Sequence, residues 1–475
     1  MIWDSSLINK YDLAGPRYTS YPTAPQFDSG ISKIALIDKM MMPSDKALSL
    51  YFHIPFCAHL CYYCACNKIV TKQYEKGAEY VELLGEEMRL RSLMLDHSKK
   101  VTQLHFGGGT PTFLTEELIR DLFKTINQYF NLVNDGSQDY SIEIDPREVT
   151  SSKLKLLTEM GINRISIGVQ DFDNKVQEAI HRVQSLETVS QLVEDARAMN
   201  IKSINFDLIY GLPYQSLEGF RDTLDKVIEL SPDRISLFNY AHLPERFRSQ
   251  KRLSSGILFC DLPERFRSQK RMPEDSLPIP SIKVQLLRMS IEYLIDAGYE
   301  YIGMDHFAKP DDSLAKAQKQ GLLQRNFQGY TTHAGTDLVA FGVSAISDLS
   351  GVYIQNHTDL SLYRSSIEKG QLPISRGYIS NFDDRIRHQV IMTLISQFEL
   401  NTTIIEQKNN IRFFEYFSKE VDNLTSMVED GMIEIQDNGM QTIIRVTERG
   451  RLLIRCICMI FDKYLSSNIK YSKVI

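Results

Sequence analysis

The sequence predicts an α/β fold built on a partial (β/α)6 barrel, in which six parallel strands are each followed by a helix. Short apolar runs rich in β-branched and aromatic residues alternate with longer segments of helical period. The intervals between these runs are long enough for crossover helices, which parallel pairing requires. From about residue 383 onward the alternation gives way to helical segments around a hairpin pattern. We therefore expect a mostly helical, winged-helix-like domain after the barrel.

The expected strands follow one another along the chain. They are 48–56, 101–106, 140–145, 164–169, 203–210 and 234–239, with a seventh strand at 299–304. Helices are expected at 74–94, 115–130, 186–199 and 217–230. Polar residues at the carboxyl ends of the strands are candidates for a site, because barrels of parallel strands place their chemistry there.

These elements divide the chain into three parts. The expected parts are an N-terminal extension at 1–45, the barrel at 46–350 and a C-terminal helical domain at 375–475. In the last part, strands 432–435 and 441–446 should pair before a final helix at 448–465.

Composition favours an intracellular enzyme. A chain of 475 residues that is 43% hydrophobic can bury a large core, so a disordered tail is excluded. The net charge of −6 argues against a general binder of nucleic acid or anionic membrane. The N-terminus lacks the pattern of a signal peptide, and no run of about eighteen apolar residues predicts a membrane span. Few cysteines in a long chain suit a reducing compartment, so we expect a cytoplasmic protein.

Three cysteines stand at spacings of four and three in Cys57-Ala-His-Leu-Cys61-Tyr-Tyr-Cys64, directly after the first expected strand. Three soft sulfur ligands suit an iron–sulfur cluster or zinc, and a four-iron cluster held by three cysteines keeps one iron open. The alternatives are a disulfide knot, or zinc with His59 as the fourth ligand. The spacing resembles that of radical S-adenosylmethionine (SAM) enzymes. That resemblance implies one 4Fe-4S cluster that reduces bound SAM to a 5'-deoxyadenosyl radical.

Polar and glycine residues mark the ends of the following strands. Gly107-Gly108-Gly109-Thr110 comes after the second strand, where missing side chains let the backbone approach a ligand. Glu143, Gln170 and Asp207 lie in or beside the third, fourth and fifth strands, where burial without a partner would be costly. A ligand could supply that partner, and so could ordinary hydrogen bonds between neighbouring strands. The glycines could equally form an ordinary turn.

Motifs along nearly the whole chain resemble the oxygen-independent coproporphyrinogen III oxidases of bacteria. They include residues 15–22, 51–57, 64–68, 105–112, 143–147, 168–172, 207–213, 238–243, 303–307, 326–330 and 450–455. Related haem chaperones share the cysteine loop but typically carry an aromatic residue in place of Cys66 and lack the 15–22 extension. Both features favour the oxidase family.

The resemblance implies roles for individual residues. Cys57, Cys61 and Cys64 would ligate the cluster, and Cys66 would serve catalysis without being a ligand. Members of this family hold two SAM molecules. The SAM on the cluster would meet Tyr51, Gly108, Glu143 and Ile346, and the second SAM would meet Tyr63, Gly109, Thr110, Gln170, Arg182, Asp207 and Ala241. Tyr63 departs from the usual phenylalanine but keeps the ring, and for Tyr51, Ala241 and Ile346 plain strand core is the alternative.

The implied reaction converts two propionates of coproporphyrinogen III to vinyl groups, giving protoporphyrinogen IX. Four substrate carboxylates need cationic partners, for which Arg17, Arg182 and Lys309 are candidates. For Arg17 and Lys309 an ordinary solvated surface charge is the alternative. A reduced flavodoxin-like electron donor and an unknown electron acceptor are implied, and we expect a monomer. A haem chaperone without decarboxylase activity is the second hypothesis. A winged-helix regulator that binds nucleic acid is the third, and it is disfavoured because the expected helix around 413–430 is acidic.

One segment departs from the family pattern. Residues 243–252 recur without change as 262–271. We interpret 253–271 as a duplicated insert within the barrel region, and we expect it to loop out of the fold because a longer surface loop costs little entropy.

Overall fold

The structure is a computed structural model that describes residues 2–242, 269–333, 335–465 and 471. The chain forms two compact units. The barrel unit comprises Ser29–Ala297 and Gly335–Gly377, and the terminal unit comprises Met1–Asp28, Gly298–Ala334 and Tyr378–Ile475. The three-part division expected from the sequence stays a prediction.

Six parallel strands form the centre of the barrel unit, as predicted. They are β1 (Leu48–Ile54), β4 (Lys100–Gly108), β6 (Asp139–Ile144), β7 (Arg164–Gln170), β8 (Ser203–Tyr210) and β9 (Arg234–Asn239). Each strand pairs in parallel with the next one in this series, so their carboxyl ends share one edge. All residues of β1 except Tyr51 are buried, including the polar Ser49 and His53, as expected for a strand covered on both faces.

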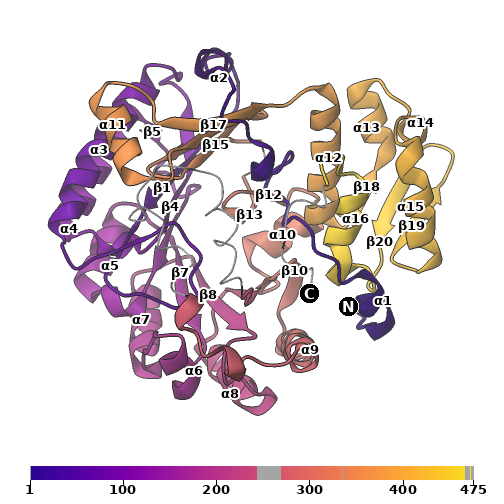
Figure 1. Ribbon diagram of the computed structural model, residues 1–475, viewed down its shortest axis with the longest axis horizontal. Helices are drawn as coiled ribbons and strands as arrows, with labels where there is room; N and C mark the ends of the chain where they lie inside the picture. Colours follow the sequence, from indigo (N-terminus) through magenta and orange to yellow (C-terminus); the bar gives the residue numbers. More distant parts are fainter. Residues whose placement is uncertain (1, 243–268, 334, 466–470, 472–475) are drawn as a thin grey trace, which may run out of the picture. The chain divides into compact units, whose positions relative to one another are not determined.

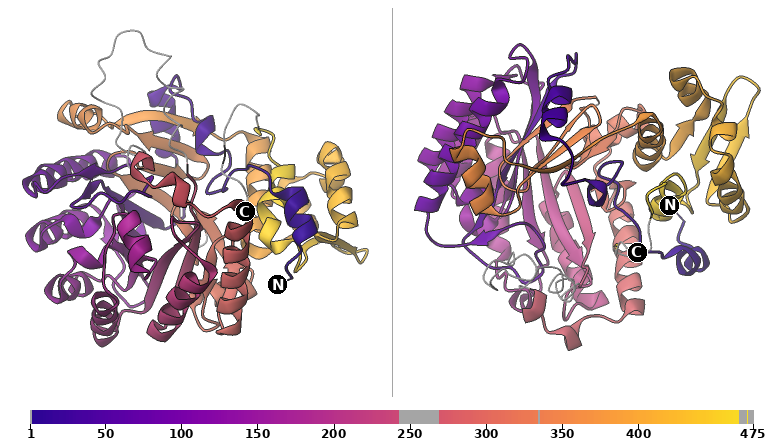
Figure 2. Two further views of the ribbon diagram at one scale, coloured as in Figure 1. Left: turned by 60° about the horizontal axis from the view of Figure 1, so that its bottom comes forward. Right: turned by 45° about the horizontal axis from the view of Figure 1, so that its top comes forward.

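Helices pack outside these strands (Figures 1 and 2). They include α3 (Glu75–Ser92), α4 (Glu116–Tyr129), α5 (Ser151–Glu159), α7 (Leu186–Ala198) and α8 (Leu217–Leu230). Thr115, Thr150, Ser185 and Ser216 cap the N-termini of α4, α5, α7 and α8, where each hydroxyl accepts a backbone N–H. The expected helices of this region are thereby confirmed. None of the described helices is long and apolar enough to cross a bilayer.

The sheet continues beyond β1 with strands that were not predicted from the sequence. β14 (Asp337–Phe341) pairs in parallel with β1, and β15 (Ile346–Leu349) and β16 (Val352–Asn356) follow in antiparallel order. β17 (Ile374–Ile379) comes next in the sheet order. These strands are short, and tertiary pairing rather than a local repeat defines them.

The terminal unit is mostly helical, as predicted. α12 (Phe382–Gln397), α13 (Thr402–Asn409), α14 (Phe413–Tyr416) and α15 (Ser418–Glu429) accompany a small antiparallel sheet of β18 (Glu399–Asn401), β20 (Thr442–Val446) and β19 (Ile433–Asp437). The predicted hairpin is therefore confirmed. The single acidic helix expected around 413–430 is broken in two at Phe417.

The last helix is shorter than predicted. Helix α16 spans Ile454–Ile460, after a 3-10 turn at Arg451–Leu453. The Asp462 carboxylate accepts the backbone N–H of Tyr464 at 2.9 Å and the Tyr18 hydroxyl at 3.0 Å. Such a side chain competes with the helical bonding pattern, which explains why the helix does not extend to residue 465.

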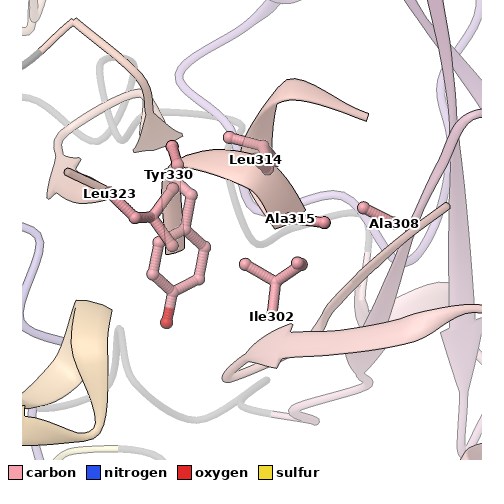
Figure 3. Packing of buried hydrophobic residues seen from close by; sticks show 7 residues of the cluster. Ile302, Ala308, Leu314, Ala315, Leu323 and Tyr330 are labelled. Carbon is pink, nitrogen blue, oxygen red and sulfur yellow. The ribbon is translucent and has the colours of Figure 1, made fainter. Parts of the chain in front are cut away.

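An apolar cluster of the terminal unit lies around β10 (Glu300–Gly303), β11 (His306–Ala308) and α10 (Ser313–Lys319). Figure 3 shows Tyr330 lying against Leu323, with Ile302, Leu314 and Ala315 close by. The Tyr330 hydroxyl donates to the carbonyl of Ile395 at 2.9 Å, so this cluster is tied to α12. The predicted seventh strand corresponds to β10, which pairs antiparallel with β11 rather than continuing the parallel series.

Most of the duplicated segment lies outside the described residues, so the expectation that it loops out stays a prediction. Its last residues are described. The Gln269 amide donates to the carbonyls of Tyr63 at 3.3 Å and Ala241 at 3.2 Å, and Met272 is buried beside them. Residues 250–252 repeat residues 269–271, so a chain without the insert presents the same three residues before Met272.

We predict that deletion of residues 253–271 leaves the melting temperature unchanged or raises it, because the retained Gln250 then takes the place of Gln269. As a matched control, Gln250→Ala should lower the melting temperature of the deletion protein but leave that of the full chain unchanged. Thermal unfolding followed by circular dichroism measures both. A deletion protein that is insoluble or melts at a lower temperature would show that the insert is part of the fold.

A fully buried ion pair joins α3 to the strands that extend the sheet. Glu87 accepts from Arg91 at 2.9 Å, from Asn356 at 2.9 Å and from the Tyr363 hydroxyl at 2.7 Å. Its second oxygen also accepts the backbone N–H of Gly342 at 2.8 Å. Both charged side chains have at most 1% exposure, so neither charge could be solvated if its partner were lost.

We predict that Glu87→Ala lowers the free energy of unfolding by about 3–5 kcal/mol, because it leaves the Arg91 charge buried and uncompensated. Glu86→Ala is the matched control, since Glu86 pairs with Arg89 on the same helix but its side chain keeps 37% exposure. That change should cost less than about 1 kcal/mol. Urea unfolding measures both, and equal effects would contradict this account of the network.

Candidate active site

The cysteine loop begins where β1 ends and is fastened at both ends. The short strands β2 (Phe56–Cys57) and β3 (Ile69–Val70) pair in parallel across its base. The middle of the loop is held by the segment after α6 (Asn174–Ala179): the Tyr62 N–H donates to Ile180 at 2.9 Å, and His181 Nδ1 bonds the carbonyl of Leu60 at 2.7 Å. The rings of Tyr62 and His181 also stack, with centroids 5.0 Å apart. These contacts fix the loop before any ligand binds.

The alternatives to an iron–sulfur site fit this loop poorly. All described cysteines are free, so no disulfide knot forms among them. His59 Nε2 lies 2.8 Å from the Glu148 carboxylate, so that nitrogen is already paired away from the sulfurs. Within the described ranges, no three His, Cys, Asp or Glu side chains converge closely enough to hold a single metal ion. A four-iron cluster takes its thiolates on separate irons and does not require such convergence.

Each of the three sulfurs has a hydrogen-bond donor nearby. The Thr110 hydroxyl lies 3.5 Å from Cys57 Sγ, and the Cys66 N–H lies 3.4 Å from Cys64 Sγ. Cys61 Sγ accepts from Arg182 at 3.5 Å and Arg147 at 3.7 Å. Three thiolates surrounded by donors and guanidinium charge are a chemically suitable donor set for the cluster.

The two outer cysteines differ in acidity. Burial raises the pKa of the Cys57 thiol to about 12, although the Thr110 hydrogen bond opposes the shift. Hydrogen bonds from the Cys66 thiol and N–H lower the pKa of Cys64, and the nearby Lys68 charge adds to this effect. The same contact raises the pKa of Cys66. Cluster binding must therefore displace a proton from Cys57, which makes assembly pH-dependent.

The glycine turn after β4 lies directly against the start of the cysteine loop. The Gly109 N–H donates to Ile54 at 2.8 Å, and the Thr110 N–H donates to Phe56 at 2.8 Å. A Cβ on Gly109 would lie 2.6 Å from the Pro55 oxygen, and Gly108 has a φ of +118° with His53 packed against it. Only glycine fits at these two positions. The turn therefore serves close backbone approach rather than being an ordinary loop.

Glu143 on β6 reaches this turn. Its Oε2 accepts the Gly108 N–H at 3.1 Å, and its Oε1 lies 3.6 Å from His105 Nε2. Burial raises the pKa of Glu143, but His105 and the Gly108 N–H outweigh burial, so the pKa is lowered overall. The side chain keeps 45% exposure although it projects from a strand deep in the sheet, so it faces open space rather than packed core.

Tyr51 lies beside this carboxylate. Its ring stacks on His105 with centroids 5.8 Å apart, and its hydroxyl lies 3.0 Å from His53 Nδ1. The ring is only partly buried, so Tyr51 is not simple strand core. Tyr51, Gly108 and Glu143 therefore come together as the sequence interpretation requires.

Asp207 on β8 already has protein partners. Its two oxygens accept from Ser166 and Asn205, each at 2.9 Å. Burial raises the pKa of Asp207 to about 6, with further repulsion from Glu143. Hydrogen bonding between strands, the alternative interpretation, is therefore part of its environment. The raised pKa nevertheless shows that these partners compensate the charge incompletely.

Gln170 and Arg182 meet at the end of β7. A Cβ on Gly168 would lie 2.8 Å from both the Gln170 amide nitrogen and Arg182 Nη2. Gln170 has a φ of +67°, which turns the chain at this strand end. Arg182 is buried and donates to the Gly168 carbonyl and to Asp145 as well as to Cys61. These residues, with Cys61, form a second group of predicted site residues that the structure brings together.

Other predicted residues are less closely joined. Tyr63 and Ala241 are linked through Gln269. Ile346 is half-buried on β15, two strands from β1 in the sheet order. In the terminal unit, Arg17 forms an ion pair with Asp305, and Lys309 follows β11. Arg17 is therefore already neutralised by a carboxylate.

Four residues that shape the site had no role predicted from the sequence. His53 and His105 contact Tyr51 and Glu143, and Asp145 and Arg147 stand beside Cys61. Their signal was present, since His105 and residues 143–147 lie in quoted motifs. The motif itself could not show which neighbour each side chain contacts.

Comparison with known proteins agrees with this geometry. Residues 51–227 match the family model described as "Radical SAM superfamily". The oxygen-independent coproporphyrinogen III oxidase of Pseudomonas aeruginosa is 49% identical over 100% of this chain and 99% of its own length. The Escherichia coli protein of the same name is 42% identical over 100% and 98%.

A solved structure agrees over the same span. The coproporphyrinogen III oxidase of Escherichia coli, described as a radical SAM enzyme, superimposes with a TM-score of 0.88. It is 42% identical and covers 98% of this chain and 99% of its own. The chain belongs to the oxygen-independent coproporphyrinogen III oxidase family of radical SAM enzymes.

Proposed function

We propose that this protein performs the anaerobic oxidative decarboxylation of two propionates of coproporphyrinogen III, giving protoporphyrinogen IX for haem synthesis. Full-length identity to oxidases of that name carries the proposal. The cysteine loop held against the Gly108–Gly109 turn supplies the matching local chemistry. No relative described above is a haem chaperone, and Cys66 stands where chaperones typically carry an aromatic residue.

We further propose the residue roles. Cys57, Cys61 and Cys64 hold the 4Fe-4S cluster, which together with SAM supplies a 5'-deoxyadenosyl radical. Tyr51, Gly108, Glu143 and Ile346 position the SAM on the cluster. Tyr63, Gly109, Thr110, Gln170, Arg182, Asp207 and Ala241 position a second SAM, and Cys66 acts in catalysis.

The chain's own residues bind and orient rather than transfer protons. Glu143 has a lowered pKa and accessible oxygens, so it is ionised at neutral pH and suited to an ammonium group. For each propionate, loss of one β-hydrogen atom, carbon dioxide and one electron leaves a vinyl group. The protein's task is to place that β-carbon and exclude water and oxygen.

The electron balance requires partners outside this chain. A reduced flavodoxin-like protein is the proposed donor, and a separate acceptor takes the electron released from each propionate. Free cysteines and an oxygen-sensitive cluster suit the cytoplasm, and we propose that the protein acts there as a monomer.

An anaerobic assay tests the function. Reconstituted protein with SAM, a reductant and an acceptor should convert coproporphyrinogen III to protoporphyrinogen IX, detected by chromatography. Cys61→Ala should abolish SAM cleavage, because one iron loses its protein ligand. Cys66→Ala should keep most of its iron but lose decarboxylation. Tight haem binding without any conversion would favour the chaperone, and normal SAM cleavage by Cys61→Ala would exclude the ligand assignment.

Asp207 gives a prediction that separates function from stability. Its pKa of about 6 lies above the usual aspartate value, so its contribution to stability falls as pH rises between about 4 and 6. Asp207→Asn should therefore raise the free energy of unfolding at pH 7 by about 1–3 kcal/mol while reducing activity. The gain in stability should shrink as the pH is lowered toward 4.

Asp348→Asn is the matched control. Burial also raises the pKa of Asp348 to about 6, and this residue has no proposed role in SAM binding. It should show a stability gain of the same sign with unchanged activity. Urea unfolding from pH 4 to 7 and the anaerobic assay measure both variants. A destabilised Asp207→Asn protein with full activity would favour the purely structural interpretation.

A further inference from the structure

The turn after β6 carries Arg147, a residue to which the family resemblance assigned no role. Asp145 caps the 3-10 turn Pro146–Glu148 and accepts the Arg147 N–H at 3.1 Å. The same carboxylate binds the Arg147 side chain through two bonds, Nε to Oδ1 at 3.0 Å and Nη2 to Oδ2 at 2.7 Å. This bidentate pairing fixes the plane of the Arg147 guanidinium.

The Asp145 carboxylate is shared by a second arginine. Arg182 Nη1 lies 2.9 Å from Asp145 Oδ2. Exposure of the side chains is 7% for Asp145, 7% for Arg182 and 16% for Arg147. The two guanidinium groups are therefore locked around one carboxylate with little access to water.

Both guanidinium groups also reach the same cysteine sulfur. Arg182 Nη1 is 3.5 Å and Arg147 Nη2 is 3.7 Å from Cys61 Sγ. Two positive charges and one carboxylate leave a net charge of +1 beside this sulfur. That charge is balanced when Cys61 is a thiolate, and the three residues are thus arranged for an anionic sulfur.

The surroundings of the other two sulfurs differ. Cys57 Sγ receives a neutral hydroxyl from Thr110, and Cys64 Sγ receives an N–H from Cys66. Lys68 directs its ammonium group to the Cys64 carbonyl oxygen at 3.0 Å. In the described part of the chain, the guanidinium groups that donate to a sulfur of the cysteine loop both donate to Cys61.

Hydrogen bonds and positive charge at a cysteine ligand favour the cluster state with more negative charge. The potential of an iron–sulfur cluster depends on its net charge, on hydrogen bonds to its sulfurs and on its exposure. We propose that Arg147 is a positioning residue: held by Asp145, it donates to Cys61 and raises the reduction potential of the cluster. The inference rests on the proposed function only for the presence of the cluster.

The reduction potential of the reconstituted cluster tests this proposal. In Arg147→Gln, the ratio of reduced to oxidised cluster at a fixed potential should fall at least tenfold, a negative shift of about 59 mV for one electron. Arg147→Lys keeps the charge but not the bidentate fork, so its shift should be smaller. Electron paramagnetic resonance during a redox titration measures the ratio, and iron analysis confirms equal loading.

Arg197→Gln is the matched control. Arg197 pairs with Asp233 at 2.8 Å in the same unit. Within the described residues, its hydrogen bonds and ion pair do not involve the cysteine loop. Its potential should equal that of the unchanged protein. If Arg147→Gln cannot be loaded with iron, the Lys variant decides: a negative shift supports the proposal, and no shift overturns it.

An unchanged or more positive potential in loaded Arg147→Gln would also overturn the proposal. Failure of the proposed function would look different. In that case the unchanged protein would convert no coproporphyrinogen III, although it holds its cluster and its reduction potential still differs from that of Arg147→Gln.

Discussion

The close approach of two strand ends is the constraint on which the site depends. The turn after β4 must lie against the start of the cysteine loop, and it does so through backbone bonds from Gly109 to Ile54 and from Thr110 to Phe56. A single Cβ at Gly109 would overlap the backbone at Pro55. Because β1, β4 and β6 are paired in parallel, their carboxyl ends bring the cysteines, the glycine turn and Glu143 to one edge.

Charge is distributed unequally around that edge. Asp145 is compensated by two arginines, which hold its pKa at about 2 despite burial. Asp207 has no cationic partner among the described residues, and burial together with the nearby Glu143 carboxylate raises its pKa. The first arrangement stabilises the cysteine loop, and the second costs stability that a cationic ligand could recover. The buried Glu87–Arg91 pair is a separate network that fastens α3 to β16 through Asn356.

Regular periodicity allowed much of the fold to be predicted. The six parallel strands and their capped helices carry strong local signals, and β8, β9 and α8 match their expected bounds. Strands β14 to β17 have no such repeat, because pairing with distant residues defines them. Cys57, Cys61 and Cys64 could be found from spacing alone. His105 and Arg147 could not, because only the folded sheet shows that they contact Glu143 and Cys61.

The duplicated segment illustrates how an insertion can leave local contacts unchanged. The two copies, residues 243–252 and 262–271, are identical in sequence. His242 is therefore followed by the same ten residues that precede Met272, as it would be in a chain without the insert. The bonds from Gln269 to Tyr63 and Ala241 can therefore form at the end of the longer connection. Loop closure grows only with the logarithm of length, so the longer connection adds about 1 kcal/mol. An unrelated insert of equal length would pay that cost and also replace the residues beside Met272, which is why a duplication is the milder change at this position.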